Sequence, residues 1–155
     1  MKRVFEIALD PNHNRLLITI DFNDFYNLRD ITLYFKNLGD IKENAFNVNY
    51  VRPGKYKMIS LYSNEIRSIN SHAFNNLHCL EVLNLDFNSL ERIDPEWFKP
   101  LFNLKELYIS ENKLLSVGSK KFESLKNLEI LTLFGSNNSF EYEKDMLHGL
   151  DNLNY

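Results

Sequence analysis

Three consecutive blocks of 24 residues decide the fold: YKMISLYSNEIRSINSHAFNNLHC (56–79), LEVLNLDFNSLERIDPEWFKPLFN (80–103) and LKELYISENKLLSVGSKKFESLKN (104–127). They align without gaps, and positions 1, 4, 6, 11, 14, 19 and 22 of every block are apolar or aromatic. Position 9 is always asparagine. Self-similarity at a fixed period of about 20 to 50 residues indicates a repeat architecture, because each unit buries its apolar face only against its neighbours.

Weaker copies flank these blocks. Upstream, residues 28–54 keep the apolar frame, although Lys36 occupies the asparagine position and Asn37 is displaced by one. Downstream, Leu128 starts another copy, and the chain stops inside the next repeat. We therefore expect residues 28–155 to form one solenoid that is truncated at its C-terminal end, where an uncovered apolar surface would permit self-association.

The first 27 residues allow two interpretations. In the first, residues 1–27 form a degenerate repeat, because Val4, Ile7 and Leu9 fall in the same frame. In the second, they form a β-hairpin cap, because apolar residues alternate with polar ones after Leu16 and the preceding run DPNHN (10–14) is typical of a turn. The sequence leaves both interpretations open.

The repeat frame predicts a curved parallel sheet. Positions 4 and 6 lie on the same face of a strand, since strand side chains alternate, and the other apolar positions close the coil around a shared core. Pro95 and Pro100 interrupt the return segment of one block, so we expect turns or 3₁₀ pieces there. The predicted fold class is α/β: a right-handed solenoid with a mostly irregular convex side.

Two columns of identical side chains have a predicted structural role. The position 9 asparagines stand where each strand leaves the sheet, and an amide there can both donate to and accept from the freed backbone groups. The position 19 phenylalanines would fill the wide convex side of the core. These residues are Asn64, Asn88 and Asn112, and Phe46, Phe74, Phe98 and Phe122.

The outward positions of the sheet form the candidate binding surface. Positions 3, 5, 7 and 8 should project from the concave face, and aromatic side chains flanked by acids recur there. Large rigid side chains suit protein recognition, because they lose little entropy when a partner buries them. Cross-strand packing is the competing explanation. The candidate residues are Tyr34, Phe35, Tyr62, Asn84, Asp86, Phe87, Tyr108, Glu111 and Phe134.

Composition narrows the class of protein. The 155 residues are 44% hydrophobic and 25% charged with a net charge of −3, which predicts a globular domain. This charge suggests neither a nucleic-acid-binding surface nor a basic patch that binds membranes. No apolar run reaches the roughly 18 residues of a membrane span, so we expect no membrane insertion. Cys79 is the single cysteine and the four histidines are scattered, so we expect no disulfide, metal, cofactor or catalytic site.

The frame LxxLxLxxNxLxxIxxxxFxxLxx resembles the leucine-rich-repeat family, in the 24-residue type common in extracellular animal proteins. The segments ITLYFKNLGDIKENAF (31–46) and MISLYSNEIRSINSHAF (58–74) are also similar to secreted arthropod repeat proteins. The resemblance implies an extracellular protein–protein recognition module that binds its partner through the concave face, and Asn137 in Asn137-Asn138-Ser139 would then be a glycosylation candidate. Secreted members usually carry disulfide-bonded caps, which this chain lacks. A cytoplasmic scaffold or adaptor, or a non-catalytic subunit of an enzyme complex, is therefore an alternative.

Overall fold

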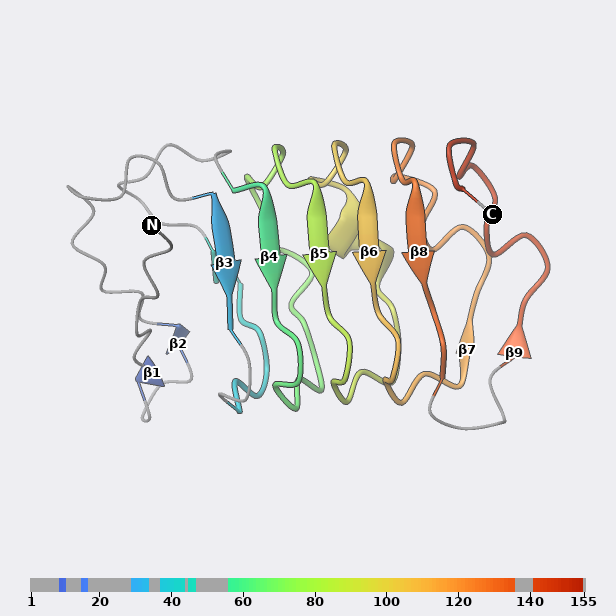
Figure 1. Ribbon diagram of the computed structural model, residues 1–155. Helices are drawn as coiled ribbons and strands as arrows, with labels where there is room; N and C mark the ends of the chain where they lie inside the picture. Colours follow the sequence, from blue (N-terminus) through green and yellow to red (C-terminus); the bar gives the residue numbers. More distant parts are fainter. Residues whose placement is uncertain are drawn as a thin grey trace.

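A single sheet of five short parallel strands organises the molecule (Figure 1). The computed structural model describes residues 9–10, 15–16, 29–33, 37–43, 45–46, 56–135 and 141–154. The strands are hydrogen-bonded in the order β3-β4-β5-β6-β8, and each neighbouring pair is parallel, which confirms the predicted pairing. They are β3 (Asp30–Thr32), β4 (Met58–Ser60), β5 (Val82–Asn84), β6 (Glu106–Tyr108) and β8 (Ile130–Thr132).

The hydrogen-bond register follows the sequence frame. Each strand centres on position 4, and the partners across the sheet are Ile31, Ile59, Leu83, Leu107 and Leu131. Ile59, Leu83 and Leu107 have no exposed surface, because each packs into a core that continues from one turn to the next. Burying such a side chain contributes roughly 1.5 to 3 kcal/mol. The predicted coil with an aliphatic interior is confirmed.

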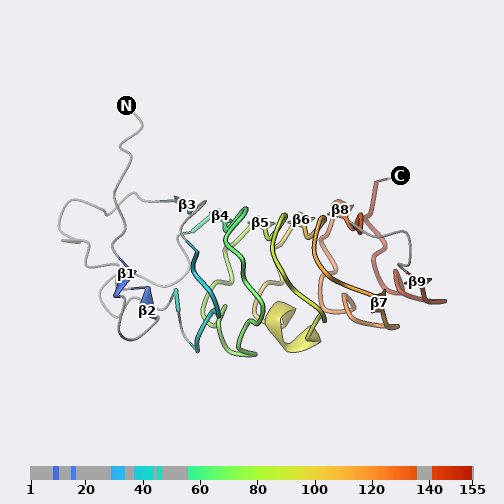
Figure 2. The same cartoon turned by 90° about the horizontal axis from the view of Figure 1, so that it is seen from below.

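The return side of the coil carries the phenylalanine column. Phe46 stacks on Phe74 with ring centroids 5.7 Å apart, and Phe98 lies 5.6 Å from Phe122. All four rings are buried. A short 3₁₀ helix, Pro95–Phe98, lies on the side of the coil away from the main sheet, as Figure 2 shows. The return segments of the described turns are otherwise mostly irregular, as the predicted fold class states.

The asparagines at position 9 form a buried ladder. The Asn88 Nδ2 group donates to the carbonyl oxygens of Leu61 at 2.9 Å and Leu85 at 3.0 Å. Its Oδ1 atom accepts the backbone N–H groups of Asn64 and Ile66, both at 3.0 Å. One amide thus satisfies backbone groups of its own turn and of the preceding turn, so the predicted structural role is confirmed.

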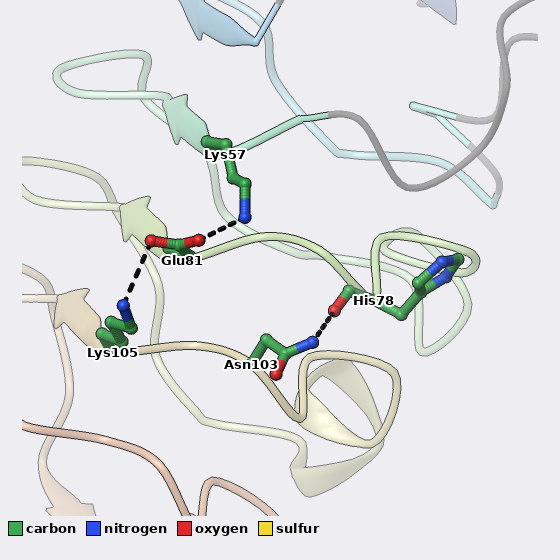
Figure 3. Close-up of polar contacts among 5 residues, drawn as sticks. All are labelled: Lys57, His78, Glu81, Asn103 and Lys105. Carbon is green, nitrogen blue, oxygen red and sulfur yellow. Dashed lines mark hydrogen bonds and ion pairs between the residues drawn. The ribbon is translucent and has the colours of Figure 1, made fainter.

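A second asparagine column, which the frame did not predict, runs along the end of the sheet where the strands begin. At position 24, Asn103 Nδ2 donates to the carbonyl oxygen of His78 at 2.8 Å (Figure 3). The same 2.8 Å bond recurs from Asn127 to Phe102 and from Asn152 to Lys126. These three asparagines therefore tie their turns to the preceding ones, whereas Cys79 occupies this position in the first block.

Two smaller pairs of strands lie outside the main sheet. Near the N-terminus, β1 (Leu9–Asp10) and β2 (Arg15–Leu16) pair antiparallel, an arrangement that the hairpin interpretation of this segment expects. The boundary at residue 27 stays a prediction. On the return side, β7 (Ser116–Val117) pairs in parallel with β9 (Glu141–Tyr142) and so joins the return segments that follow β6 and β8.

Candidate binding surface on the main sheet

The outward positions of the four turns from 58 to 135 form a continuous surface, which we call the sheet face. It flanks the central residue of each strand, which is buried in β4, β5 and β6 and partly buried in β8, and its side chains are half-buried or exposed except for Ser110. Within the described residues it comprises Met58, Ser60, Tyr62, Ser63, Val82, Asn84, Asp86, Phe87, Glu106, Tyr108, Ser110, Glu111, Ile130, Thr132, Phe134 and Gly135.

Each of the four turns places one aromatic side chain on the sheet face. Phe87 is 49% exposed and Phe134 is 68% exposed, whereas Tyr62 and Tyr108 are half-buried. The Tyr62 and Phe87 rings pack together with centroids 5.0 Å apart and planes tilted by 52°. Tyr62 and Phe87 therefore take part in cross-strand packing, and Phe87 and Phe134 keep a large part of their surface exposed.

Phe87 adopts a backbone conformation that a phenylalanine does not favour. At position 8 the chain turns out of the sheet, and Ser63, Phe87 and Glu111 have φ of 55°, 55° and 53°. This left-handed region costs a residue with a Cβ roughly 1 to 2 kcal/mol. The turn is fixed by the Phe87 N–H, which donates to the carbonyl oxygen of Ser110 at 3.0 Å. Neither burial nor backbone geometry accounts for an exposed aromatic side chain at this position.

A chain of polar caps closes the ends of the strands. The Asn84 Oδ1 atom accepts the N–H of Asp86 at 2.9 Å, and Asp86 Oδ1 accepts the N–H of Ser110 at 2.6 Å. Ser110 Oγ accepts the N–H of Phe134 at 3.1 Å. Asn84 and Asp86, singled out as ligand contacts, thus also satisfy backbone donors. Position 7 is Tyr62 in the first block and Asp86 and Ser110 in the next two, so no residue type that recurs in every block marks this role.

Three carboxylates, those of Asp86, Glu106 and Glu111, lie near Tyr108 on the sheet face. Burial raises the pKa of the Asp86 carboxyl, the Ser110 N–H opposes this rise, and the charge of Glu111 adds to it. The Tyr108 hydroxyl donates to Glu106 Oε2 at 2.7 Å. This bond raises the pKa of Tyr108, as do its partial burial and the charges of Glu106 and Asp86. The three carboxylates therefore act on a common part of the sheet face.

Three of the predicted site residues cannot be placed on this surface. Tyr34, Phe35 and Asn137 lie outside the described residues. In the part of the chain that the structure describes, no group of three or more His, Cys, Asp or Glu side chains is arranged to hold a metal ion. A search of the same residues finds no helix with the length and apolar character of a membrane span.

Comparisons with known proteins agree with the repeat frame. A family model described as "Leucine rich repeat" matches residues 79–139. The chain is similar to TLR13 in the crystal structure of its complex with ssRNA13, with 28% identity, a TM-score of 0.68 and 85% of this chain covered. It is also similar to the leucine-rich repeat domain of APL1B, with 27% identity, a TM-score of 0.62 and 79% coverage. The chain spans 18% of the first structure and 34% of the second, and no curated protein matches its sequence. Since the sequence frame, the fold and the similar structures all contain the same repeat, the chain folds as a leucine-rich-repeat solenoid, and residues 79–139 match the family itself.

Proposed function

We propose that this protein recognises a protein partner through its sheet face. The observation that carries the proposal is Phe87, which is 49% exposed and holds a left-handed backbone conformation. Ser63 and Glu111 share this backbone conformation at position 8, so Phe87 differs from them in placing a large aromatic ring on the surface there. Phe134, two positions past β8, supplies a second exposed ring on the same surface.

The remaining contact residues lie around these two rings. Tyr62 packs against Phe87 and holds its ring in place, while Tyr108, Asn84, Asp86 and Glu111 offer hydrogen-bonding groups. Aromatic anchors surrounded by polar groups are the usual composition of a protein interface, in which a few buried rings supply most of the binding energy. Tyr34 and Phe35 would extend the same columns by one turn in the sequence frame.

We also propose that the protein is a non-catalytic, extracellular binding module. Leucine-rich-repeat domains are generally non-catalytic binding modules, and the 24-residue frame resembles the extracellular animal type. If the chain is secreted, Asn137 is the glycosylation site. Residues 1–27 form a degenerate repeat or a β-hairpin cap in front of the solenoid at 28–155. Mass determination of Asn137 in protein from its native source tests the compartment, since an unmodified Asn137 in every molecule would count against secretion.

A pull-down with matched variants tests the binding site. Proteins that the wild-type chain retains should be lost with the double variant Phe87→Ala/Phe134→Ala. They should be kept by Phe102→Ala, because Phe102 is 53% exposed but lies off the sheet face at the end of the sheet where the strands begin. Equal retention by the double variant and the wild type would refute the proposal. Circular dichroism of each variant confirms that the coil is intact.

A further inference from the structure

We infer that the partner segment which docks on the sheet face carries lysine or arginine side chains next to apolar ones. The inference rests on the proposed function and specifies the chemistry of its partner. Its starting point is the charge of the sheet face. Positions 3, 5, 7 and 8 of four turns hold no Lys, Arg or His, although the chain contains 18 Lys and Arg residues. They hold the three carboxylates Asp86, Glu106 and Glu111.

These carboxylates have no cationic partner within the described residues. The ion pairs of the described residues lie elsewhere, most prominently where Glu81 is held between Lys57 and Lys105 at the beginning of the strands (Figure 3). On the sheet face, Glu106 and Asp86 instead accept hydrogen bonds from neutral donors. Their negative charge is therefore available to a partner, and complementary charge would both steer the encounter and select the partner.

Apolar surface lies directly beside the carboxylates. In the register of the sheet, Glu106 stands between Val82 and Ile130, and Ile130 is 38% exposed. Neighbouring strands are about 4.8 Å apart, so a single long side chain reaches both kinds of surface. The aliphatic stem of lysine or arginine would cover Val82 or Ile130 while its charged head pairs with Glu106. An arginine could also stack on the exposed ring of Phe87.

The same charges disfavour a nucleic acid on this surface. Phosphate backbones bind through Lys and Arg side chains, and the sheet face between 58 and 135 has none to offer. RNA binding is the competing hypothesis that the experiment must test, because the chain is similar to TLR13 in a structure that contains an RNA. Neutralising the carboxylates should weaken the affinity for a cationic polypeptide and strengthen the affinity for a polyanionic RNA.

The experiment selects short random peptides on phage against the immobilised full chain. Recovered peptides are synthesised, and their affinities are measured for the wild type and for two triple variants of equal charge change. The first variant, Asp86→Asn/Glu106→Gln/Glu111→Gln, neutralises the sheet face and keeps the hydrogen-bond acceptors of the carboxylates. The second variant, Glu91→Gln/Glu123→Gln/Asp151→Asn, neutralises three exposed carboxylates outside the sheet face.

We expect the recovered peptides to be enriched in Lys and Arg over Asp and Glu. Their affinity should fall on the order of tenfold in the first variant, stay unchanged in the second, and weaken with added salt for the wild type. Peptides without cationic residues, or equal binding to the first variant, would overturn the inference. So would a single-stranded RNA that binds the wild type and displaces the peptides.

The peptides also separate this inference from the proposed function. If they depend on Phe87 and Phe134 but not on the carboxylates, the sheet face remains the binding site and only the cationic partner is refuted. If they bind the variant Phe87→Ala/Phe134→Ala as tightly as the wild type, the proposed function is refuted as well. A selection that recovers no peptide overturns the inference and leaves the proposed function to the pull-down.

Discussion

The side-chain oxygen of Asn88 accepts the backbone N–H of Asn64 at a distance of 3.0 Å, so each position 9 asparagine is bonded to the turn before it. The same oxygen accepts the N–H of Ile66. Asn88 Nδ2 also donates to the carbonyl oxygen of Leu61 in the preceding turn, and Asn103 Nδ2 makes a comparable bond to His78, but in an exposed position. These two asparagines allow a comparison of side-chain amides that bind the preceding turn in buried and exposed surroundings.

We expect Asn88→Ala to destabilise the protein by about 1 to 3 kcal/mol for each buried group left without a partner. Asn103→Ala should cost roughly 0.5 to 1.5 kcal/mol or less, because water replaces the lost amide. Urea denaturation of both variants measures the difference in the free energy of unfolding. Equal losses in the two variants would show that burial does not set the cost.

The backbone strain at Phe87 gives a second prediction. Alanine at position 87 keeps the unfavourable φ and loses the contact with Tyr62, whereas glycine loses the contact and relieves the strain. Phe87→Gly should therefore be more stable than Phe87→Ala by about 1 kcal/mol, the reverse of the usual order in a strand. Thermal unfolding of the pair tests this. A more stable alanine variant would mean that the left-handed conformation carries no strain.

Leucine packing at the centre of the sheet gives a third prediction. Leu83 is fully buried in the continuous core, so Leu83→Ala should destabilise the protein by about 2 to 5 kcal/mol. Leu115, which is 63% exposed, is the matched control, and Leu115→Ala should leave the free energy of unfolding within about 0.5 kcal/mol of the wild type. Urea denaturation distinguishes the two, and a loss below about 1 kcal/mol at Leu83 would argue against the continuous core.

The alternating charges at position 2 give a fourth prediction. Hydrogen bonds from Lys57 and Lys105 lower the pKa of Glu81, so the stabilisation by this group is present above its unfolded pKa and lost as the pH falls through the folded value. Stability at neutral pH should decrease from wild type to Glu81→Gln to Glu81→Lys, by the small amounts typical of surface pairs. Added salt should narrow the gap between the last two variants, and a gap that is insensitive to salt would exclude an electrostatic cause.

Asp86 should show the opposite dependence on pH. Its pKa is raised by burial, so its stabilisation of the fold is complete below the unfolded pKa and is lost as the pH rises through the folded value. Asp86→Asn does not titrate. The free energy of unfolding of Asp86→Asn should therefore increase relative to that of the wild type as the pH rises above about 4. Urea denaturation across this range measures the shift, and a difference that moves toward the wild type would contradict the raised pKa.

The sequence predicted the core of this fold better than its surface. Leu83 and Asn88 recur at fixed intervals, because every turn poses the same packing and hydrogen-bonding problem, and periodicity reveals such residues. The capping role of Asp86 depends on one N–H in the next turn, which Ser110 supplies, and no periodic signal marks it. The position 24 column was missed because Cys79 replaces asparagine in the first block.

The asparagine ladder also has a direction. Asn88 satisfies the carbonyl oxygen of Leu61 and the N–H groups of Asn64 and Ile66, all in the turn that precedes it along the chain. A turn is therefore completed by residues that a ribosome adds about one block later. During synthesis, each turn would therefore make its last backbone hydrogen bonds only after the asparagine of the following turn has emerged from the ribosome.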